Sequence, residues 1–204
     1  MTSTDKNIVL ITGDILLGSR SASKGEKAVQ DLQSQNLPGT VELTQIDDVE
    51  VKHGRVDVLV NNAGIFSSGD PDATDVQSLI DNFTTNAAGS FATVKDFRAA
   101  PFPLRVRLGS ISTHVDKSHP TYKLKSYSYR MSKAALKMAT ACHHAECEGK
   151  RWKVFVFCPG PTASEMTRRI KRDAGAKPTS QGTAPLVGIV NGERDADTGK
   201  FFDG

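Results

Sequence analysis

The chain has 204 residues, with 26 Lys and Arg against 23 Asp and Glu, so its formal net charge is only +3. This weak balance argues against a nucleic-acid-binding protein, which concentrates basic residues on one face. No apolar run approaches the roughly 20 residues that cross a bilayer, and residues 1–7 are polar, so we expect neither a membrane span nor secretion. Three cysteines suit a reducing compartment, which predicts a cytoplasmic protein.

Short apolar segments alternate with longer amphipathic ones along the chain. The expected strands are 7–12, 14–19, 41–47, 56–61, 105–111, 153–157 and 200–202. The expected helices are 25–35, 76–97, 126–148, 163–173 and 183–190. Most of the strands are almost continuously hydrophobic, which is typical of strands buried on both faces of a parallel sheet. The alternation predicts a single α/β domain over residues 1–204, with a doubly wound, mostly parallel sheet of about seven strands.

Two of the joins between strands are too short for this fold. Parallel neighbours need a crossover of a dozen or more residues, yet only Gly13 and Asp14 separate Thr12 from Ile15. Likewise, only the eight residues 48–55 separate two later strands. A Gly-Asp pair is compatible with a local antiparallel hairpin. We therefore expect either a hairpin or segments missing from this sequence, after Gly13 and near residue 48.

Tyr129 and Lys133 form the first chemically informative pair. Their spacing of four residues on a predicted helix places them on one face, one turn apart. A nearby ammonium group favours the tyrosinate and lowers the pKa of the phenol. A tyrosine tuned in this way can donate or accept a proton near neutral pH. Neither Tyr122 nor Tyr127 has a lysine four residues later.

Other polar or glycine-containing motifs follow the ends of predicted strands. The sequence Asn-Asn-Ala-Gly occupies residues 61–64, Asn86 lies in the next helix, Ser110 ends a strand, and Pro159 and Gly160 follow another. Open α/β sheets bind their ligands at the carboxyl ends of the strands. The pattern therefore predicts a ligand site at this edge of the sheet.

In its order and spacing, this set of motifs resembles the short-chain dehydrogenase/reductase family, and the carbonyl-reductase-like members in particular. The resemblance implies a Rossmann-like fold and a catalytic tetrad of Asn86, Ser110, Tyr129 and Lys133. By this resemblance Tyr129 protonates the substrate carbonyl oxygen and Ser110 orients it. Lys133 lowers the pKa of Tyr129 and binds the nicotinamide ribose, while Asn86 holds a water of a proton relay. Ser112 is the alternative to Ser110.

The resemblance also implies a set of residues that bind the nicotinamide cofactor. They are Gly13, Ser19, Arg20, Asp47, Asn62, Ala63, Gly64, Tyr129, Lys133, Pro159, Gly160 and Ser164. Arg20 stands where an acidic residue would select NAD(H), and a guanidinium accommodates a 2′-phosphate, so we expect NADP(H) rather than NAD(H). Thr162 is the alternative to Ser164 as the residue that bonds the carboxamide.

One family feature is missing. The glycine-rich turn Thr-Gly-x-x-x-Gly-x-Gly, with the helix that it opens, holds the cofactor pyrophosphate, but here Gly13 runs directly into an apolar segment. The main prediction is an NADP(H)-dependent oxidoreductase that interconverts a small-molecule carbonyl and an alcohol. The alternative is a catalytically inactive relative that serves as a binding or scaffold protein. The family also implies a homodimer through helices 76–97 and 126–148.

Two further kinds of site were considered. Cys142, His143, His144 and Cys147 have the composition of a metal site, but on a helix adjacent histidines project about 100° apart and cysteines five residues apart suit no tetrahedral site. We therefore expect no metal. The Gly-x-Ser-x-Gly motif of serine hydrolases does not occur in the sequence, which argues against that class.

Overall fold

The computed structural model of the protein describes residues 7–11, 14–18, 22–35, 40–44, 58–66, 75–96, 102–105, 115–118, 122, 125–150, 152–164, 166 and 176–203. Its strands are β1 (Asn7–Ile11), β2 (Asp14–Gly18), β3 (Thr40–Thr44), β4 (Val58–Val60), β5 (Phe102–Arg105), β6 (Val154–Cys158) and β7 (Phe201–Asp203). Its helices are α1 (Ala22–Gln33), α3 (Val76–Phe83), η2 (Thr84–Ala88), α4 (Gly89–Asp96), α6 (Tyr127–Glu146), α8 (Thr179–Val190) and η3 (Asp195–Asp197).

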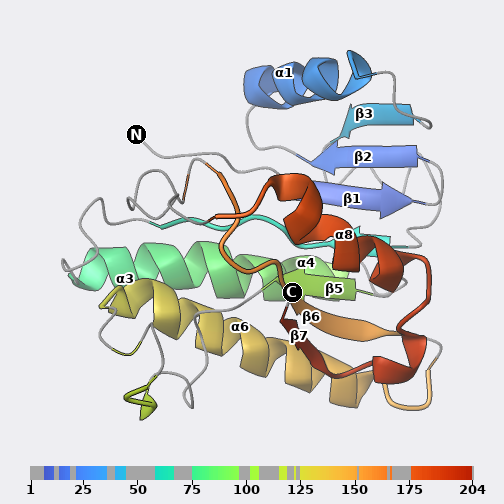
Figure 1. Ribbon diagram of the computed structural model, residues 1–204. Coiled ribbons are helices and arrows are strands. Elements are labelled where there is room, and N and C mark those ends of the chain that lie inside the picture. Colours follow the sequence, from blue (N-terminus) through green and yellow to red (C-terminus); the bar gives the residue numbers. More distant parts are fainter. Residues whose placement is uncertain are drawn as a thin grey trace.

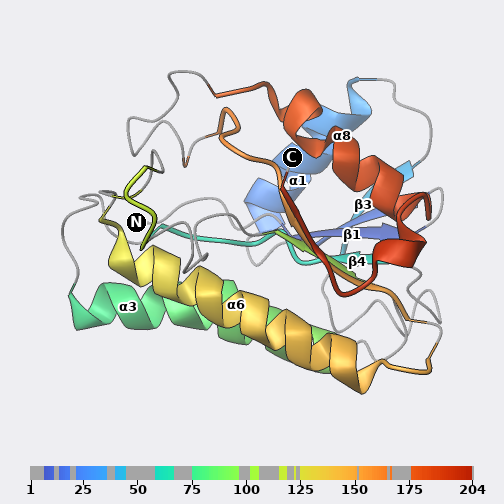
Figure 2. The ribbon, with the colours of Figure 1, turned by 60° about the horizontal axis from the view of Figure 1, so that its bottom comes forward.

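Helices cover both faces of the strands, as expected for an α/β fold. Helices α3 and α6 lie side by side on one face, and α1 and α8 lie on the other (Figures 1 and 2). All five residues of β6 are buried, in agreement with its continuous hydrophobic sequence. Val156 packs toward α6 against Leu136, whereas Phe155 and Phe157 pack against Ile189 of α8. The core therefore lies on both sides of β6.

The strands are arranged in the order β3-β2-β1-β4, followed by a second group in the order β5-β6-β7. In the described part of the chain, three of the five strand pairings are parallel. The expectation of parallel neighbours fails only at β1, which is antiparallel to both β2 and β4. Ile11 pairs with Asp14, so the short join is a hairpin. Two residues cannot form the crossover that a parallel pair requires.

Because β1 is reversed, its amino end and not its carboxyl end lies at the edge of the sheet formed by the carboxyl ends of β2 and β4. Asn7 pairs with Gly18, and Ile8 pairs with Val60. The amino end of β1 therefore lies beside the carboxyl ends of its two neighbours. Its carboxyl end, at Ile11, lies at the opposite edge of the sheet.

Two other elements differ from the sequence-based expectations. Strand β5 covers residues 102–105 instead of 105–111, and residues 106–111 lie outside the described part of the chain. The helix expected over 76–97 is divided by η2, which is π-helical. Most of the helix expected over 163–173 lies outside the described residues. No helix in the described ranges is long and apolar enough to span a bilayer.

Helix α3 begins at a defined cap. The side chain of Asp75 accepts hydrogen bonds from the backbone N–H of Ser78 at 2.6 Å and from its hydroxyl at 3.1 Å. These bonds lower the pKa of Asp75, because they favour its charged form. The cap satisfies a backbone donor that the first helical turn leaves unpaired. It thereby fixes the start of the helix that leads to Asn86.

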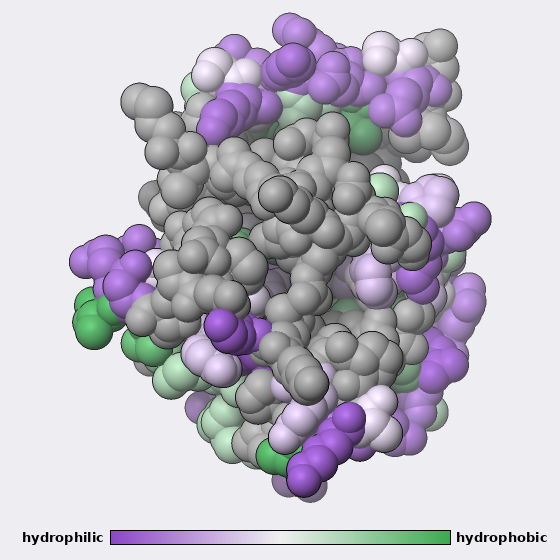
Figure 3. Space-filling view, turned by 60° about the vertical axis from the view of Figure 1, so that its left-hand side comes forward, coloured by the Kyte–Doolittle hydropathy of each residue, from purple (hydrophilic) through white to green (hydrophobic). Residues whose placement is uncertain are grey.

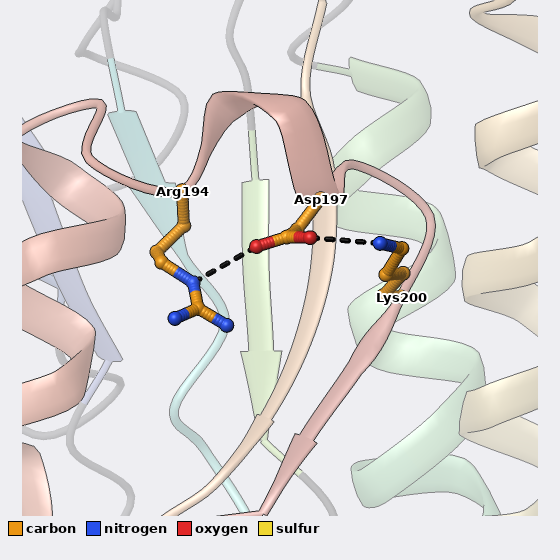
Figure 4. Close-up of polar contacts among 3 residues, drawn as sticks. All are labelled: Arg194, Asp197 and Lys200. Carbon is orange, nitrogen blue, oxygen red and sulfur yellow. Dashed lines mark hydrogen bonds and ion pairs between the residues drawn. The ribbon is translucent and has the colours of Figure 1, made fainter.

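The turn before β7 is held by an ion-pair cluster (Figure 4). Asp197 lies between Lys200, whose Nζ is 2.8 Å from Oδ1, and Arg194, whose Nε is 3.0 Å from Oδ2. The backbone N–H of Gly199 then donates to the carbonyl of Val154 at 2.7 Å. Gly199 has a φ of +83°, a conformation that favours glycine. The cluster thus directs the chain into its parallel pairing with β6.

Candidate active site

Asn86 lies at the centre of the candidate site and is fully buried, with an exposed fraction of 0%. Its Oδ1 accepts a hydrogen bond from the backbone N–H of Ile65 at 2.7 Å. Its Nδ2 donates to the carbonyl of Ile65 and to Ser132 Oγ, both at 3.0 Å. Asn86 therefore ties the loop after β4 to helix α6. It lies within η2, and π-helical turns are frequent at functional sites.

Lys133 is buried against the same loop. A Cβ atom added to Gly64 would lie 3.3 Å from Lys133 Nζ and 3.4 Å from Asn86 Oδ1. Glycine at this position therefore allows the backbone to approach both polar groups closely. The exposed fraction of Lys133 is only 6%. The structure thus brings together three of the residues expected at the site.

Tyr129 lies one turn before Lys133 on α6, with its ring half-buried. Lys133 Nζ is 5.5 Å from the centroid of the Tyr129 ring. The ring also contacts Phe66, with the two centroids 5.5 Å apart. Ser132 Oγ donates to the backbone carbonyl of Tyr129 at 2.8 Å. The tyrosine and lysine are therefore adjacent, as their spacing predicts.

The remaining described candidates lie in two loops. Asn62 and Ala63 follow β4 and are half-buried. Pro159 is buried and Gly160 half-buried directly after β6. Of the two alternatives for the carboxamide contact, Thr162 is buried and donates to the carbonyl of Gly160 at 3.1 Å, whereas Ser164 is half-buried. The hydroxyl of Thr162 is therefore engaged within its own loop.

Several expected site residues lie outside the described part of the chain: Gly13, Ser19, Arg20, Asp47, Ser110 and its alternative Ser112. The described residues that flank two of these segments lie at opposite edges of the sheet. Gly18, which precedes Ser19, lies at the same edge of the sheet as Val60. Ile11 and Asp14 lie at the opposite edge.

The geometry fits one half of a nicotinamide dinucleotide better than the other. Lys133 adjoins Gly64 and lies beside the Tyr129 ring, where the family resemblance expects the nicotinamide ribose. For the pyrophosphate, the fold family uses the turn at the carboxyl end of the first strand. Here the amino end of β1 occupies that position beside β4. In the described residues, the phosphate side of the site therefore does not fit the family's arrangement.

The orientation of β1 can be tested directly by cross-linking. We expect Ile8→Cys and Val60→Cys to form a disulfide, because these residues are cross-strand partners. Antiparallel partners have Cα atoms about 4.5–5.5 Å apart, within the range that a disulfide bridges. The matched pair Ile11→Cys and Val60→Cys should stay reduced, since three residues extend about 10 Å along a strand. Mass spectrometry after mild oxidation shows whether each cysteine pair has formed a disulfide. In both variants the exposed Cys142 is replaced by Ser. Cross-linking of the second pair alone would mean that β1 is parallel.

Two buried polar residues at the site were not anticipated. Ser132 links Asn86 to Tyr129, and Asn82 lies one turn before Asn86 with 1% exposure. A signal was present in the sequence, since Ser78, Asn82, Asn86 and Ser90 recur every four residues. Among the described residues, no three His, Cys, Asp or Glu side chains are grouped so that they could bind a metal ion.

Comparison with known proteins agrees with this arrangement. A family model described as short chain dehydrogenase matches residues 12–175. The chain is 28% identical to short-chain dehydrogenase anuI of Penicillium roqueforti (strain FM164) over 230 aligned positions, which cover 92% of this chain and 89% of that protein. Because 230 positions exceed the 204 residues here, the relative carries residues with no counterpart in this chain.

Two further comparisons concern an enzyme and a solved structure. The chain is 35% identical to carbonyl reductase (NADPH) 1 of Homo sapiens over 92 residues, or 40% of this chain and 33% of that enzyme. The crystal structure of a gluconate 5-dehydrogenase from Burkholderia cenocepacia J2315, in complex with NADP and tartrate, superimposes with a TM-score of 0.74. It covers 93% of this chain and 82% of that one at 15% identity, a level that establishes similarity of fold.

Proposed function

The chain belongs to the short-chain dehydrogenase family, and on that premise we propose that it is an NADP(H)-dependent oxidoreductase that interconverts a small carbonyl compound and an alcohol. When bound, NADP(H) would supply or accept the hydride. Tyr129 gives its phenolic proton to the carbonyl oxygen in reduction and takes it back in oxidation. Ser110 orients that oxygen, Lys133 tunes Tyr129 and holds the ribose, and Asn86 holds a water of the proton relay.

The observation that carries this proposal is the convergence of three separate segments. Asn86 from η2 and Lys133 from α6 both border Gly64 in the loop after β4, and Asn86 accepts a hydrogen bond from Ile65 in the same loop. Tyr129 lies next to Lys133 and also contacts Phe66. General acid–base catalysis needs the proton donor to be held in place by its neighbours. A purely structural role does not require a buried lysine beside a tyrosine.

The preference for NADP(H) rests on the segment after β2. Ser19 and Arg20 directly follow Gly18, which lies at the edge of the sheet that carries the candidate site. A guanidinium pairs with phosphate through two parallel hydrogen bonds, which favours the 2′-phosphate. The human relative is named for NADPH, and the gluconate 5-dehydrogenase was crystallised with NADP.

The reversed β1 favours a second candidate function. Without a glycine-rich turn beside β4, the pyrophosphate lacks the backbone donors that the family provides. The chain would then be a catalytically inactive relative, which uses its fold for binding or as a scaffold. The tetrad residues would remain in place without carrying out turnover.

Fluorescence titration of the purified chain with NADPH, followed by a panel of carbonyl substrates, separates these functions. Turnover of any panel member with NADPH supports the oxidoreductase. Absence of both NADPH binding and turnover supports the inactive relative, because the reversed β1 leaves the pyrophosphate without the family's backbone donors. Binding of NADPH without turnover of any panel member contradicts that explanation of inactivity.

We also propose that the chain forms a homodimer through α3 and α6. These adjacent helices expose large apolar side chains, with exposed fractions between 46% and 75%: Val76, Ile80, Phe83, Tyr127, Met131 and Met138. Figure 3 shows hydrophobic side chains at the surface of the lower half of the molecule, where α3 and α6 lie, whereas α1 forms a hydrophilic top. A second copy of these helices would cover this apolar surface.

The Ile80→Glu variant is expected to be monomeric, because it places a charge within the apolar surface. Light scattering of the variant and of the unmodified chain measures the effect. Val187→Glu, on α8 of the other face and 57% exposed, is the matched control and should remain dimeric. A monomeric unmodified chain contradicts the proposal.

A further inference from the structure

Two rows of buried polar side chains face each other between α3–η2 and α6. The first row consists of Ser78, Asn82 and Asn86, and the second of Ser128 and Ser132, each spaced four residues apart. The exposed fractions of these side chains range from 0% to 7%. Residues four apart lie one above another on a helix. The polar groups therefore form a ladder between two helices that pack side by side (Figure 2).

The hydrogen bonds of the ladder join the helices at two successive levels. Asn86 Nδ2 donates to Ser132 Oγ at 3.0 Å, and Asn82 Nδ2 donates to Ser128 Oγ at 3.4 Å. Asn82 Nδ2 also donates to the carbonyl of Ser78 at 2.7 Å. Its Oδ1 accepts from Asn86 Nδ2 at 3.4 Å. Both the donor and the acceptor of the Asn82 amide are thus used.

Asn86 alone cannot define how α6 is positioned along its partner. Ser128 and Ser132 carry the same hydroxyl about one turn apart, so Asn86 could bond either one after a displacement of about 6 Å along the axis. Asn82 removes this ambiguity, because it meets Ser128 only when Asn86 meets Ser132. In the displaced arrangement Asn82 would lie beyond the start of α6, which begins at Tyr127. Buried polar residues select one register in other helix pairs by the same principle.

We infer that Asn82 is a positioning residue that fixes the register of α6 and thereby holds Tyr129 and Lys133 opposite Gly64. A displacement of one turn would move Lys133 away from Gly64. In the observed register, Lys133 Nζ lies 3.3 Å from the position that a Cβ atom on Gly64 would take. The position of the phenol relative to the loop after β4 would change with it. The effect on turnover rests on the proposed function, whereas the effect on register does not.

The test uses Asn82→Leu in the Ile80→Glu background, which is expected to be monomeric, so that all distances lie within one chain. Spin labels are placed at the exposed positions Phe83→Cys and Met138→Cys, with Cys142→Ser. In Asn82→Leu, pulsed electron–electron double resonance should show a second distance that differs from the first by up to about 6 Å. Carbonyl turnover, measured without labels, should fall at least tenfold. Thr140→Val is the control, because Thr140 is buried on α6 and donates only to the carbonyl of Leu136 on its own helix at 2.9 Å. Thr140→Val should show a single distance between the spin labels, and its carbonyl turnover should stay within twofold of that of the unmodified chain.

A second substitution separates positioning from general stability. Ser128→Ala, added to Asn82→Leu, removes the alternative partner of Asn86, so the single distance should return and turnover should recover to within threefold. Ser128→Ala also removes a buried hydroxyl that Asn82→Leu deprives of its partner, so the return of the single distance, and not a recovery of stability, identifies positioning. A single distance in Asn82→Leu, or a second distance without loss of turnover, overturns the inference. If the unmodified chain has no turnover, the proposed function fails and the distances alone decide the role of Asn82.

Discussion

The Tyr129→Phe variant is expected to lose carbonyl turnover by about a thousandfold, within the range that general acid–base catalysis contributes. The substitution removes the phenolic oxygen and leaves the ring that contacts Phe66. Binding of NADPH should therefore change by less than about twofold, which fluorescence titration can measure. Steady-state kinetics with the best carbonyl substrate of the panel measures the loss.

The same helix offers a close control for this experiment. Tyr127 lies two residues earlier on α6 and is 46% exposed, and no lysine follows it at four residues. Tyr127→Phe should leave both turnover and NADPH binding unchanged. If Tyr129→Phe keeps the activity of Tyr127→Phe, then Tyr129 is not the proton donor.

The second large effect concerns the phosphate side of the site. Inserting a glycine-rich turn and a helix between Gly13 and Asp14, about 20 residues in all, should strengthen NADPH binding at least about a hundredfold. A crossover of this length allows β1 to run parallel to β2 and β4. The end of β1 would then lie beside Asn62 and Gly64, with backbone donors directed at the pyrophosphate. Two hydrogen bonds to a charged group, at about 1.5–3 kcal/mol each, account for this factor.

An insertion of the same length with valine in place of the turn glycines controls for the crossover itself. This insertion should still allow β1 to run parallel to β2 and β4. Its valine side chains, however, should keep the cofactor phosphates from approaching the backbone closely. NADPH titration of the three proteins gives the comparison. Equal affinity of the unmodified chain and the glycine-rich variant would mean that the pyrophosphate is already held by other residues.

Hydrophobic patterns and helical spacing predicted most of the elements and the central pair of the site. The buried β6 and the adjacency of Tyr129 and Lys133 follow from local sequence. The start of β5 was missed because Pro103 lies within it. Among the described strands, β5 is hydrogen-bonded to β6 alone, and a strand side without a hydrogen-bonded neighbour accommodates a missing N–H.

The orientation of β1 and the role of Asn82 were harder to predict. A two-residue join permits a hairpin, but the sequence does not reveal which strands then become neighbours of β1. Similarly, polar residues every four positions in 78–90 are compatible with a solvent-facing helix. Only the packing of α3 against α6 buries Asn82 opposite Ser128. The orientation of β1 and the burial of Asn82 both depend on contacts between elements that are distant in the sequence.

The hairpin of β1 and β2 also affects how the chain folds. Paired residues in this hairpin are between three and eleven positions apart, from Ile11 with Asp14 to Asn7 with Gly18. Closing such short loops costs little entropy, and hairpins form within about 1–10 μs. A parallel pair has to close a much longer loop before its first contact forms. The reversed strand thus lowers the contact order of the amino-terminal region, which favours rapid formation of this part of the sheet.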